Sequence, residues 1–327
     1  MGLAVATTDT ILDFDQLIGW ADDDHAAALA VFRTTCADLP GRDWASICAK
    51  AATNPAPRAF FERLFRPVLI QDGTPMLFTG YYEPELSGSL APDADYAYPI
   101  FALPPDLPKD RPWLTRQQID QTRALLGQGF EIAWLTDPVE VFFLQVQGSG
   151  RIKLPDGRVI RVGYAGKNGH PYASIGAELV VRGVFTPEQV SADSIRAWVR
   201  GNPELGAALL WTNASYVFFR ELPDLPADQG PLGTMKRSVT PRRSIAVDPA
   251  FVRLGAPVWI EKAGNAPMNR LMVAQDTGSA IKGAQRAEIF FGTGVDAGQQ
   301  AGRIRDGGRM VVLLPLQLVD VLTVANP

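Results

Sequence analysis

The stretch from Leu271 to Gly294, LMVAQDTGSAIKGAQRAEIFFGTG, limits the possible folds of this chain more than any other. Its apolar start, residues 271–274, predicts a buried strand that leads to Asp276 and a turn of small residues. A second predicted strand, residues 287–291, carries Glu288 as a lone carboxylate among apolar neighbours. Two acids near the ends of successive strands are suited to proton transfer on a ligand that lies across a sheet. Because poor solvation disfavours a charged carboxylate, we expect the pKa of Glu288 to be raised toward that of a general acid.

A purely structural interpretation of the two acids stays open at this point. Asp276 can cap the turn that follows it, and Glu288 can face outward and pair with Arg286 or Lys282. A carboxylate in a strand is by itself weak evidence for catalysis.

Short predicted strands joined by turns recur through the C-terminal part of the chain, at residues 244–247, 257–261, 271–274, 287–291 and 310–314. This pattern predicts a closed β-barrel. Near the other end, from residue 11 to about residue 65, apolar residues at helical spacing predict helices that cover a sheet. The fold class that we expect is therefore mainly β with helices.

Strand periodicity starts at residue 68. Residues 68–70 and 76–79 flank Asp72-Gly73, a pair that predicts a β-hairpin. Tyr81 and Tyr82 follow beside acidic residues. The two rings are suited to a sugar-stacking wall, and ordinary packing at a half-buried strand end explains them equally well.

The middle of the chain mixes both kinds of pattern. Residues 139–147, which end in Gln147, predict a strand, and a turn-rich loop at 163–172 contains Tyr164 and offers groups suited to a hydroxyl-rich ligand. The other predicted elements are a hairpin of 151–154 with 159–162, helices at 115–126, 175–184 and 186–202, and a strand at 215–220. Thr115 and Gln118 predict a capping box for the first of these helices.

The length of 327 residues predicts two domains. Two segments rich in proline or glycine, residues 91–112 and 222–233, are typical of domain boundaries or long ordered loops. The formal net charge is −4 and both signs are interspersed, so we expect no nucleic acid partner.

Features that indicate a compartment are few. No window approaches the roughly 20 apolar residues that a membrane span requires, and we expect no signal peptide in the start MGLAVATTDT. Cys36 and Cys48 are spaced for a small disulfide loop, and two buried free thiols are equally compatible with the sequence.

Histidine is also sparse. His25 and His170 have no Cys or His partner at metal-ligand spacing, so we expect no zinc site. The sequence does not favour a Ser-His-Asp triad, although a carboxylate partner for His170, from Asp156 or Glu178, remains open.

Seven strings, in order along the chain, resemble the membrane-bound lytic murein transglycosylase A family: TGYYEPELSGS, FFLQVQGSGRI, GYAGKNGHPYASIG, NASYVFFRE, SVTPRRSIAVDP, DTGSAIKG and EIFFGTG. The resemblance extends over nearly the whole chain. It implies a double-psi β-barrel domain with N-terminal helices, made of residues 1–84 and 222–327. A β-rich domain, residues 85–221, is inserted between them, with a groove for glycan strands at the junction.

The resemblance also implies an activity. Such enzymes cleave the bond between N-acetylmuramic acid and N-acetylglucosamine in peptidoglycan without water, and they leave a 1,6-anhydromuramoyl end. They use no metal or organic cofactor. We expect a periplasmic protein, associated with the outer membrane, that reaches a membrane only through a lipid anchor not contained in this sequence.

The barrel part of the family pattern carries three aspartates, whose positions fall on Asp248, Asp276 and Glu288. Position 288 resembles the one that holds the catalytic acid and base, and the family pattern has Asp there. The extra methylene of glutamate moves the carboxyl by roughly an ångström, a displacement that can lower a rate about 100-fold. Whether this chain is as active as its relatives therefore depends on Glu288.

Five further residues are candidates for contact with the sugars: Tyr81, Tyr82, Gln147, Tyr164 and Lys282. Two rival hypotheses accompany the transglycosylase. Glu288 and Asp276 can serve as the acid and base of a β-1,4-glycan hydrolase. Alternatively, the chain is a non-catalytic peptidoglycan-binding protein.

Overall fold

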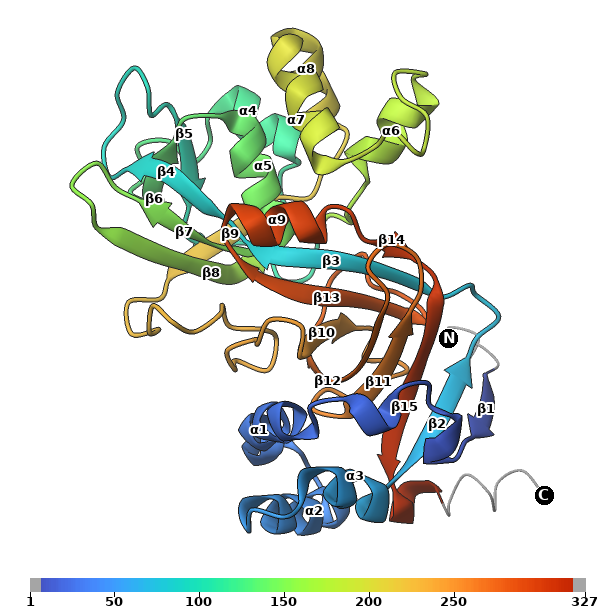
Figure 1. Ribbon diagram of the computed structural model, residues 1–327. Helices are drawn as coiled ribbons and strands as arrows, with labels where there is room; N and C mark the ends of the chain where they lie inside the picture. Colours follow the sequence, from blue (N-terminus) through green and yellow to red (C-terminus); the bar gives the residue numbers. More distant parts are fainter. Residues whose placement is uncertain (1–6, 320–327) are drawn as a thin grey trace. The chain divides into compact units, whose positions relative to one another are not determined.

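The computed structural model describes residues 7–319 and divides them into two compact units (Figure 1). The first unit contains the residues up to Tyr81, Leu232–Gly292 and the residues from Arg303 onward. The second contains Tyr82–Pro231 and Thr293–Gly302. Most of the N-terminal segment on which the signal-peptide expectation rests lies outside the described residues.

A nine-stranded sheet forms the frame of the first unit, in the order β1-β2-β15-β11-β12-β10-β13-β3-β14. Its strands are β1 (Thr8–Ile11), β2 (Phe65–Gln71), β3 (Leu77–Glu83), β10 (Ser244–Val247), β11 (Pro257–Lys262), β12 (Met268–Asp276), β13 (Arg286–Thr293), β14 (Arg305–Asp306) and β15 (Gly308–Pro315). The pairing of β10 with β12 is parallel, whereas β10 pairs with β13 in the antiparallel sense. The last residues of β3 and β13 belong to the second unit.

Two expectations about this sheet concern its closure into a barrel and its first hairpin. The strand order among the described residues is linear, so the closed barrel that the sequence predicts is not detected. The hairpin predicted around Asp72-Gly73 is wrong, because β2 pairs with β1 and β15, and β3 lies between β13 and β14. The Asp72 carboxylate instead accepts hydrogen bonds from the backbone N–H groups of Thr74 and Ala284. A local turn signal does not determine which distant strand completes the pairing.

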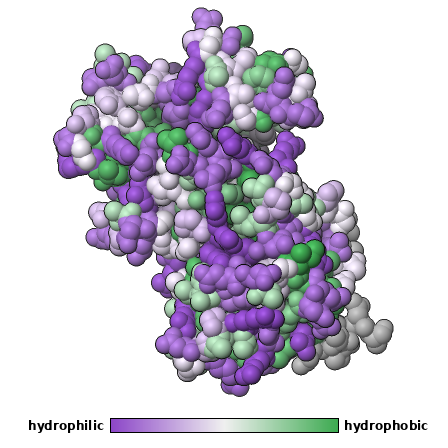
Figure 2. All heavy atoms as spheres, viewed as in Figure 1, coloured by the Kyte–Doolittle hydropathy of each residue, from purple (hydrophilic) through white to green (hydrophobic). Residues whose placement is uncertain are grey.

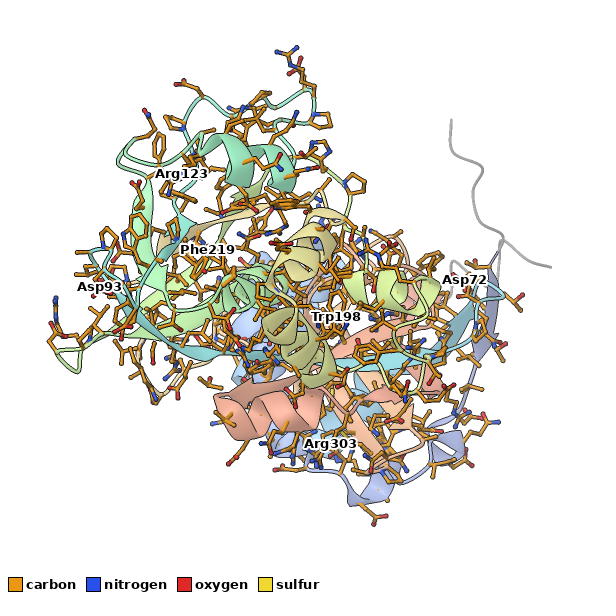
Figure 3. All side chains as sticks on the ribbon, turned by 90° about the horizontal axis from the view of Figure 1, so that it is seen from above. Asp72, Asp93, Arg123, Trp198, Phe219 and Arg303 are labelled. Carbon is orange, nitrogen blue, oxygen red and sulfur yellow. A yellow bond between two sulfur atoms is a disulfide. The ribbon has the colours of Figure 1, made fainter. Side chains whose placement is uncertain are left out.

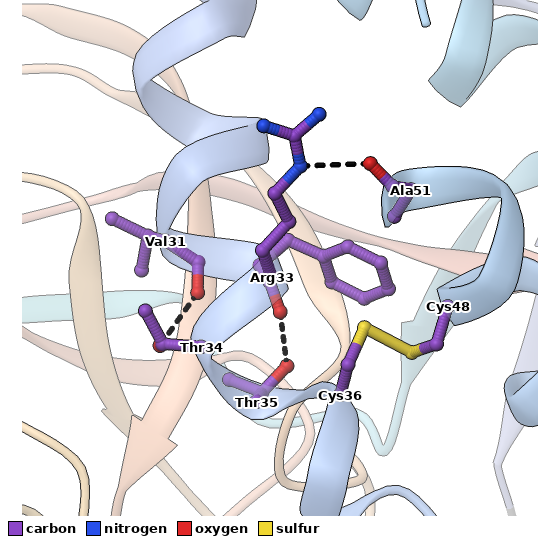
Figure 4. The surroundings of a disulfide bond; sticks show 8 residues. Val31, Arg33, Thr34, Thr35, Cys36, Cys48 and Ala51 are labelled. Carbon is purple, nitrogen blue, oxygen red and sulfur yellow. Dashed lines mark hydrogen bonds between the residues drawn. A yellow bond between two sulfur atoms is a disulfide. The ribbon is translucent and has the colours of Figure 1, made fainter. Parts of the chain in front are cut away.

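Three helices pack on this sheet, as the periodicity of the N-terminal region predicts: α1 (His25–Thr35), α2 (Arg42–Ala52) and α3 (Pro57–Leu64) (Figure 1). They bury a group of aromatic rings against apolar strand residues, with Phe32, Trp44 and Trp259 almost fully enclosed. A disulfide joins Cys36, after α1, to Cys48 in α2, with 5.5 Å between the Cα atoms (Figure 4). The Arg33 side chain also donates to the carbonyl of Ala51 across the two helices.

The second unit is built on a six-stranded sheet in the order β5-β6-β4-β7-β8-β9. The strands are β4 (Glu85–Ser89), β5 (Tyr98–Phe101), β6 (Glu131–Leu135), β7 (Ser149–Lys153), β8 (Val159–Lys167) and β9 (Val217–Glu221). The helices are α4 (Arg116–Thr122), α5 (Pro138–Gln147), α6 (Ile175–Val181), α7 (Ala192–Gly201), α8 (Pro203–Trp211) and α9 (Val295–Ala301). The predicted hairpin of β7 with β8 is confirmed, as is the capping box of Thr115 with Gln118 at the start of α4.

The strand predicted at residues 139–147 is wrong, because these residues form helix α5. Asp137 caps the helix by accepting a hydrogen bond from the Val139 N–H, and Gly148 ends it in the left-handed conformation. One side of α5 packs on the sheet through Leu144, and Phe142 enters a second core among the other helices. A helix buried on both sides is apolar all round, and short apolar runs do not distinguish it from a strand.

Other boundaries differ from the prediction in smaller ways. Helix α4 ends at Thr122, α7 starts at Ala192 rather than at residue 186, and α8 was not predicted. Tyr164 lies in strand β8 rather than in a loop. The proline-rich residues 91–112 contain β5 and lie within the second unit, so they form no boundary, whereas the segment 222–233 does contain a change of unit, at Pro231.

Hydrophilic residues predominate on the face shown in Figure 2, with apolar residues interspersed among them. None of the helices in residues 7–319 is both long and apolar enough to cross a membrane.

Candidate active site

A short central strand brings the two predicted acids together. In β10, Ala246 is paired with Asp276 of β12 on one side and with Glu288 of β13 on the other. Paired residues on neighbouring strands project from the same face of a sheet. The two carboxylates therefore flank a small methyl side chain on one face, and their Cα atoms lie two strand spacings apart, about 9.5 Å.

A bulge in β12 directs Asp276 to this face. The register between β10 and β12 shifts after Ile245, which pairs with Ala274, so that Ala246 meets Asp276 and not Gln275. Gln275 is fully buried and bonds through its side chain to the hydroxyls of Ser244 and Thr34. A strand without the bulge would reverse the side-chain alternation and point the carboxylate to the other face.

Glu288 is partly buried and has a hydroxyl, not a cation, as its direct partner. Thr79 of the neighbouring strand β3 donates to its Oε1 at 2.7 Å, and Arg286 donates to the Thr79 oxygen at 2.8 Å. No described basic side chain forms an ion pair with Glu288. Burial raises the pKa of Glu288, and the charge of Asp276 raises it further against the opposing effects of Thr79 and Arg286. The predicted direction of the shift is confirmed.

The outward-facing interpretation of Glu288, in which it pairs with Arg286 or Lys282, is therefore wrong. Arg286 uses its guanidinium on the carbonyls of Leu77 and Ala287 as well as on Thr79. Lys282 is exposed and lies 3.6 Å from the carboxylate of Asp248.

The Tyr81 side chain lies on the same face of the sheet as the two acids and bonds to Asp276. Its hydroxyl donates to Asp276 Oδ2 at 3.2 Å, and its ring packs on Phe290 with 5.2 Å between the ring centres. Burial, together with the charges of Asp276 and Glu288, raises the pKa of Tyr81 well above its usual value. The phenol therefore stays protonated and serves as a hydrogen-bond donor at neutral pH.

Asp276 also caps the following turn, as the structural interpretation holds. Its Oδ1 accepts from the backbone N–H groups of Thr234 and Thr277 and from the Thr234 hydroxyl, each at 2.9 Å. Burial nevertheless raises the pKa of Asp276, although these bonds act in the opposite direction. One side chain thus holds the loop in place and projects a carboxyl oxygen toward Tyr81.

Asp248, the third acid, is placed differently. Its buried carboxylate accepts hydrogen bonds from the backbone N–H groups of Gly283 and Ala250. It fixes the loop between β12 and β13, and within the described residues it makes no hydrogen bond to Asp276 or Glu288. Its geometry is that of a residue that positions the loop.

The remaining candidates for sugar contact lie in the second unit. The Gln147 side-chain oxygen, at the end of α5, accepts from the Tyr82 N–H at 3.0 Å, and the Tyr82 hydroxyl accepts from Arg196. Tyr81 and Tyr82 are consecutive in β3, so their rings point to opposite faces and do not form one wall. Tyr164 lies on β8 with half of its surface exposed.

Sequence reasoning missed the partners of the acids. Thr79 and Thr234 hold Glu288 and Asp276, yet they come from segments about 210 and 40 residues away. Strand alternation does place Thr79 on the same face as Tyr81, which is a usable signal. The sequence did not indicate the burial of Glu83, whose carboxylate accepts from Arg151, Arg161 and the Thr293 hydroxyl.

His170 does not form the carboxylate pair that the sequence left open. A ring nitrogen of His170 lies 2.7 Å from the carbonyl oxygen of Trp113, an arrangement in which the histidine donates, and the described carboxylates do not bond to it. Residues 7–319 contain no group of three or more His, Cys, Asp or Glu side chains arranged to hold a metal ion.

Comparisons with known proteins assign these residues to a family. Residues 77–220 match the family model described as the MltA specific insert domain, and residues 243–314 match the 3D domain. A crystal structure of the membrane-bound lytic murein transglycosylase from Agrobacterium tumefaciens shares 32% identity, with a TM-score of 0.85, 96% of this chain covered and 99% of that chain. The chain belongs to the MltA family.

Two further relatives support this assignment. Membrane-bound lytic murein transglycosylase A of Vibrio cholerae is 34% identical over 246 residues, which are 72% of this chain and 64% of the relative. The crystal structure of Escherichia coli MltA with bound chitohexaose is 27% identical with a TM-score of 0.76, and 94% of each chain is covered. The match spans slightly less than two thirds of the Vibrio relative. In this MltA family member, Asp248, Asp276 and Glu288 all lie within the 3D domain match.

Proposed function

We propose that this chain is a lytic transglycosylase that cleaves the β-1,4 bond between N-acetylmuramic acid and N-acetylglucosamine in peptidoglycan and leaves 1,6-anhydromuramoyl ends. The observation that carries the proposal is Glu288. In a chain that belongs to the MltA family, this acid is partly buried, has a raised pKa and lacks a described ion pair. A carboxyl of this kind is protonated at a higher pH than usual and can still lose its proton.

The reaction needs one proton carrier because the nucleophile belongs to the substrate. Protonated Glu288 donates to the glycosidic oxygen while the bond from that oxygen to the anomeric carbon breaks. The C6 hydroxyl oxygen of the same muramoyl residue attacks the anomeric carbon, and its proton passes to the Glu288 carboxylate. The acid is regenerated and no water is consumed.

The neighbours of Glu288 adjust its proton affinity in opposite directions. Asp276 raises the pKa through its charge, whereas Thr79 and Arg286 lower it by stabilising the carboxylate. The balance suits a group that must first give and then take a proton. Tyr81, held by Asp276, offers a hydroxyl on the same face for contact with the sugar.

The resemblance to the family implies aspartate where this chain has Glu288. A longer side chain displaces the proton carrier by about 1 Å, and the expected cost is about 100-fold in rate. The proposed activity is therefore weaker than that of a chain with aspartate at this position.

The name of the E. coli structure states that MltA binds chitohexaose, a glycan. We infer that this chain also takes glycan strands, with Tyr81, Tyr82, Gln147, Tyr164 and Lys282 as contacts. The half-exposed ring of Tyr164 is the best placed of these for stacking on a sugar. The proposed domains are a double-psi barrel from residues 1–84 and 222–327 and an insert from 85–221.

The proposed location is the periplasm, with attachment to the outer membrane through a lipid anchor. The disulfide between Cys36 and Cys48 supports an oxidising compartment. The Vibrio cholerae relative is named membrane-bound.

The products test the reaction directly. Purified sacculi are digested with the protein, and the released muropeptides are separated and weighed by mass spectrometry. Anhydromuramoyl ends support the proposal, and Glu288→Gln, assayed in parallel, must release far fewer of them. Products with reducing ends would overturn it.

One observation favours hydrolysis as the second candidate. Asp276 and Glu288 lie on one face with a strand between them, and inverting hydrolases place their two carboxyls about 6.5 to 9.5 Å apart. Digestion in ¹⁸O-labelled water separates the candidates, because hydrolysis incorporates the label into the new end. Binding to sacculi without any release of muropeptides would instead indicate a non-catalytic binding protein.

A further inference from the structure

The second unit contains a cavity of about 630 Å³ that none of the proposed catalytic or sugar-contacting residues lines. Its walls come from β5, α4, α7 and α8 and from the turn before α5. The volume is in the range of sites that enclose a small organic molecule. Arg123, at the end of α4, belongs to the wall and is labelled in Figure 3.

A buried cation forms part of this wall. Arg116 is 4% exposed, and its Nε and Nη2 donate to the carbonyls of Asn213 and Ser215 and to the side-chain oxygen of Gln145. Its guanidinium also lies over the rings of Phe142 and Tyr216, at 4.7 and 5.0 Å. These partners are neutral, and within the described residues Nη1 makes no hydrogen bond. Burial lowers the pKa of Arg116 although the charge of Asp120 acts in the opposite direction, so a further anion beside the guanidinium is favoured.

An acid stands one helical turn away. Asp120 follows Arg116 by four residues in α4, and both line the cavity. Among the described residues they form no ion pair with each other. Asp120 instead accepts a hydrogen bond at 3.0 Å from the indole N–H of Trp211.

Three other charged residues line the cavity, and Arg123 among them is exposed to solvent. Arg200 forms ion pairs of 2.6 Å with both Asp137 and Glu140. Arg116 and Asp120 make hydrogen bonds only to neutral partners, and the charge of each acts on the other. Tyr98, Leu125 and Leu210 supply apolar wall around them.

We propose that this cavity binds a small zwitterion with an apolar body, such as a free amino acid with an aromatic or large aliphatic side chain. Arg116 binds its carboxylate, Asp120 binds its ammonium group, and the apolar wall encloses its side chain. The site is independent of the reaction proposed for Glu288.

Nuclear magnetic resonance at Trp211 tests the site. The full chain is labelled with ¹⁵N in its tryptophan indoles, the Trp211 signal is assigned with Trp211→Phe, and phenylalanine is titrated in both its L and D forms. A saturable shift of the Trp211 signal is expected, since that N–H bonds to Asp120. The absence of a saturable shift with either form would overturn the proposal.

Two analogues of phenylalanine, each lacking one of its two charged groups, test the recognition of those groups. 3-Phenylpropanoate lacks the ammonium group and 2-phenylethylamine lacks the carboxylate, and each is expected to bind at least about tenfold more weakly than phenylalanine. Asp120→Asn should reduce the affinity for phenylalanine and 2-phenylethylamine while leaving that for 3-phenylpropanoate unchanged or improved. Equal affinities for the three molecules would show apolar binding without recognition of a zwitterion, and would overturn the proposal.

A matched pair of variants on α8 tests the location. Ala207 lines the cavity and its neighbour Ala208 is exposed and does not. Ala207→Phe should abolish binding, and Ala208→Phe should leave it intact, with melting temperatures confirming that both fold. Unchanged binding in Ala207→Phe would place the ligand elsewhere and refute this site.

Discussion

Two glutamates in strands of this protein, Glu83 in the second unit and Glu288 in the first, have opposite surroundings. Glu83 is 1% exposed and is paired with Arg151 at 2.9 Å and Arg161 at 2.7 Å. Glu288 accepts a hydrogen bond from Thr79 and has no described ion pair. Two cations compensate the charge of the first, whereas burial makes the charge of the second unfavourable.

The difference separates a structural acid from a chemical one. A carboxylate between two guanidinium groups holds segments together, here the end of β3, strands β7 and β8 and, through Thr293, the segment that leads to α9. A carboxyl with a raised pKa exchanges its proton more readily near neutral pH. Removing Glu83 should therefore affect folding, and removing Glu288 should affect the reaction.

The largest effect is expected for Glu288→Gln. The amide cannot transfer the proton, so the initial rate of anhydromuropeptide release should fall about 100- to 10 000-fold. Mass spectrometry of digested sacculi measures the rate, and the circular dichroism spectrum serves as the control for folding. If the variant keeps most of its activity, Glu288 takes no part in the reaction.

Glu83→Gln should mainly reduce stability. Breaking a buried ion pair leaves Arg151 and Arg161 without a counter-charge and costs about 3 kcal/mol, which urea unfolding measures. Glu85→Gln is the matched control, because its 3.0 Å pair with Lys153 is more exposed than the pairs of Glu83 and should contribute less than about 1 kcal/mol. Equal losses of unfolding free energy in the two variants would contradict the structural role assigned to Glu83.

Glu288→Asp tests the length of the side chain. The resemblance to the family implies aspartate at this position, so the shorter side chain should raise the rate of sacculus digestion by up to about 100-fold. Glu83→Asp serves as the comparison, since shortening that acid brings no gain in rate. A decrease in the rate of Glu288→Asp would mean that this chain has adapted its site to glutamate.

The pH dependence should move in opposite directions in two variants. The free enzyme needs protonated Glu288, so kcat/KM falls as the pH rises through the pKa of this group. Thr79→Val removes a bond that lowers this pKa and should shift the fall to higher pH, whereas Asp276→Asn removes a charge that raises it and should shift the fall to lower pH. The measurement is the pH profile of kcat/KM on soluble glycan strands for the parent and both variants. Shifts in the same direction would refute the opposing effects of Thr79 and Asp276 on the pKa of Glu288.

The smallest expected effect is a pH-dependent change in the melting temperature of Glu288→Gln. The pKa of Glu288 is raised in the folded chain above its reference value of 4.5, so its contribution to stability is present below that value and is lost as the pH rises through the folded pKa. Glu288→Gln should therefore melt at a higher temperature than the parent near pH 7, and this advantage should disappear near pH 4. Calorimetry at the two pH values measures the difference, and a lower melting temperature at pH 7 would contradict it.

The strands around the site follow from local sequence. The apolar runs before Asp276 and around Glu288 form β12 and β13 as predicted, and Thr115 starts α4 as its capping pattern indicates. These features depend on residues close to one another in the chain.

Features that depend on distant residues were not available from the sequence. The fully buried Gln275 sits at the bulge that turns Asp276 toward Ala246, and its side chain bonds to Ser244 and to Thr34 of α1. Helix α5 was mistaken for a strand, since its apolar residues serve two cores that only the folded chain assembles. Glu83 and Glu288 look alike in the sequence as acids in β-strands, and their different partners decide what each does.

The sequence by itself determined the family pattern, most of the strands and the identity of the acids, because short-range periodicity and residue type are written along the chain. Tertiary structure decided the strand pairing, the bulge and the counter-charges, because these depend on which distant segments meet. A carboxyl group acquires its proton affinity from those neighbours, so its chemistry is fixed only once the sheet has formed.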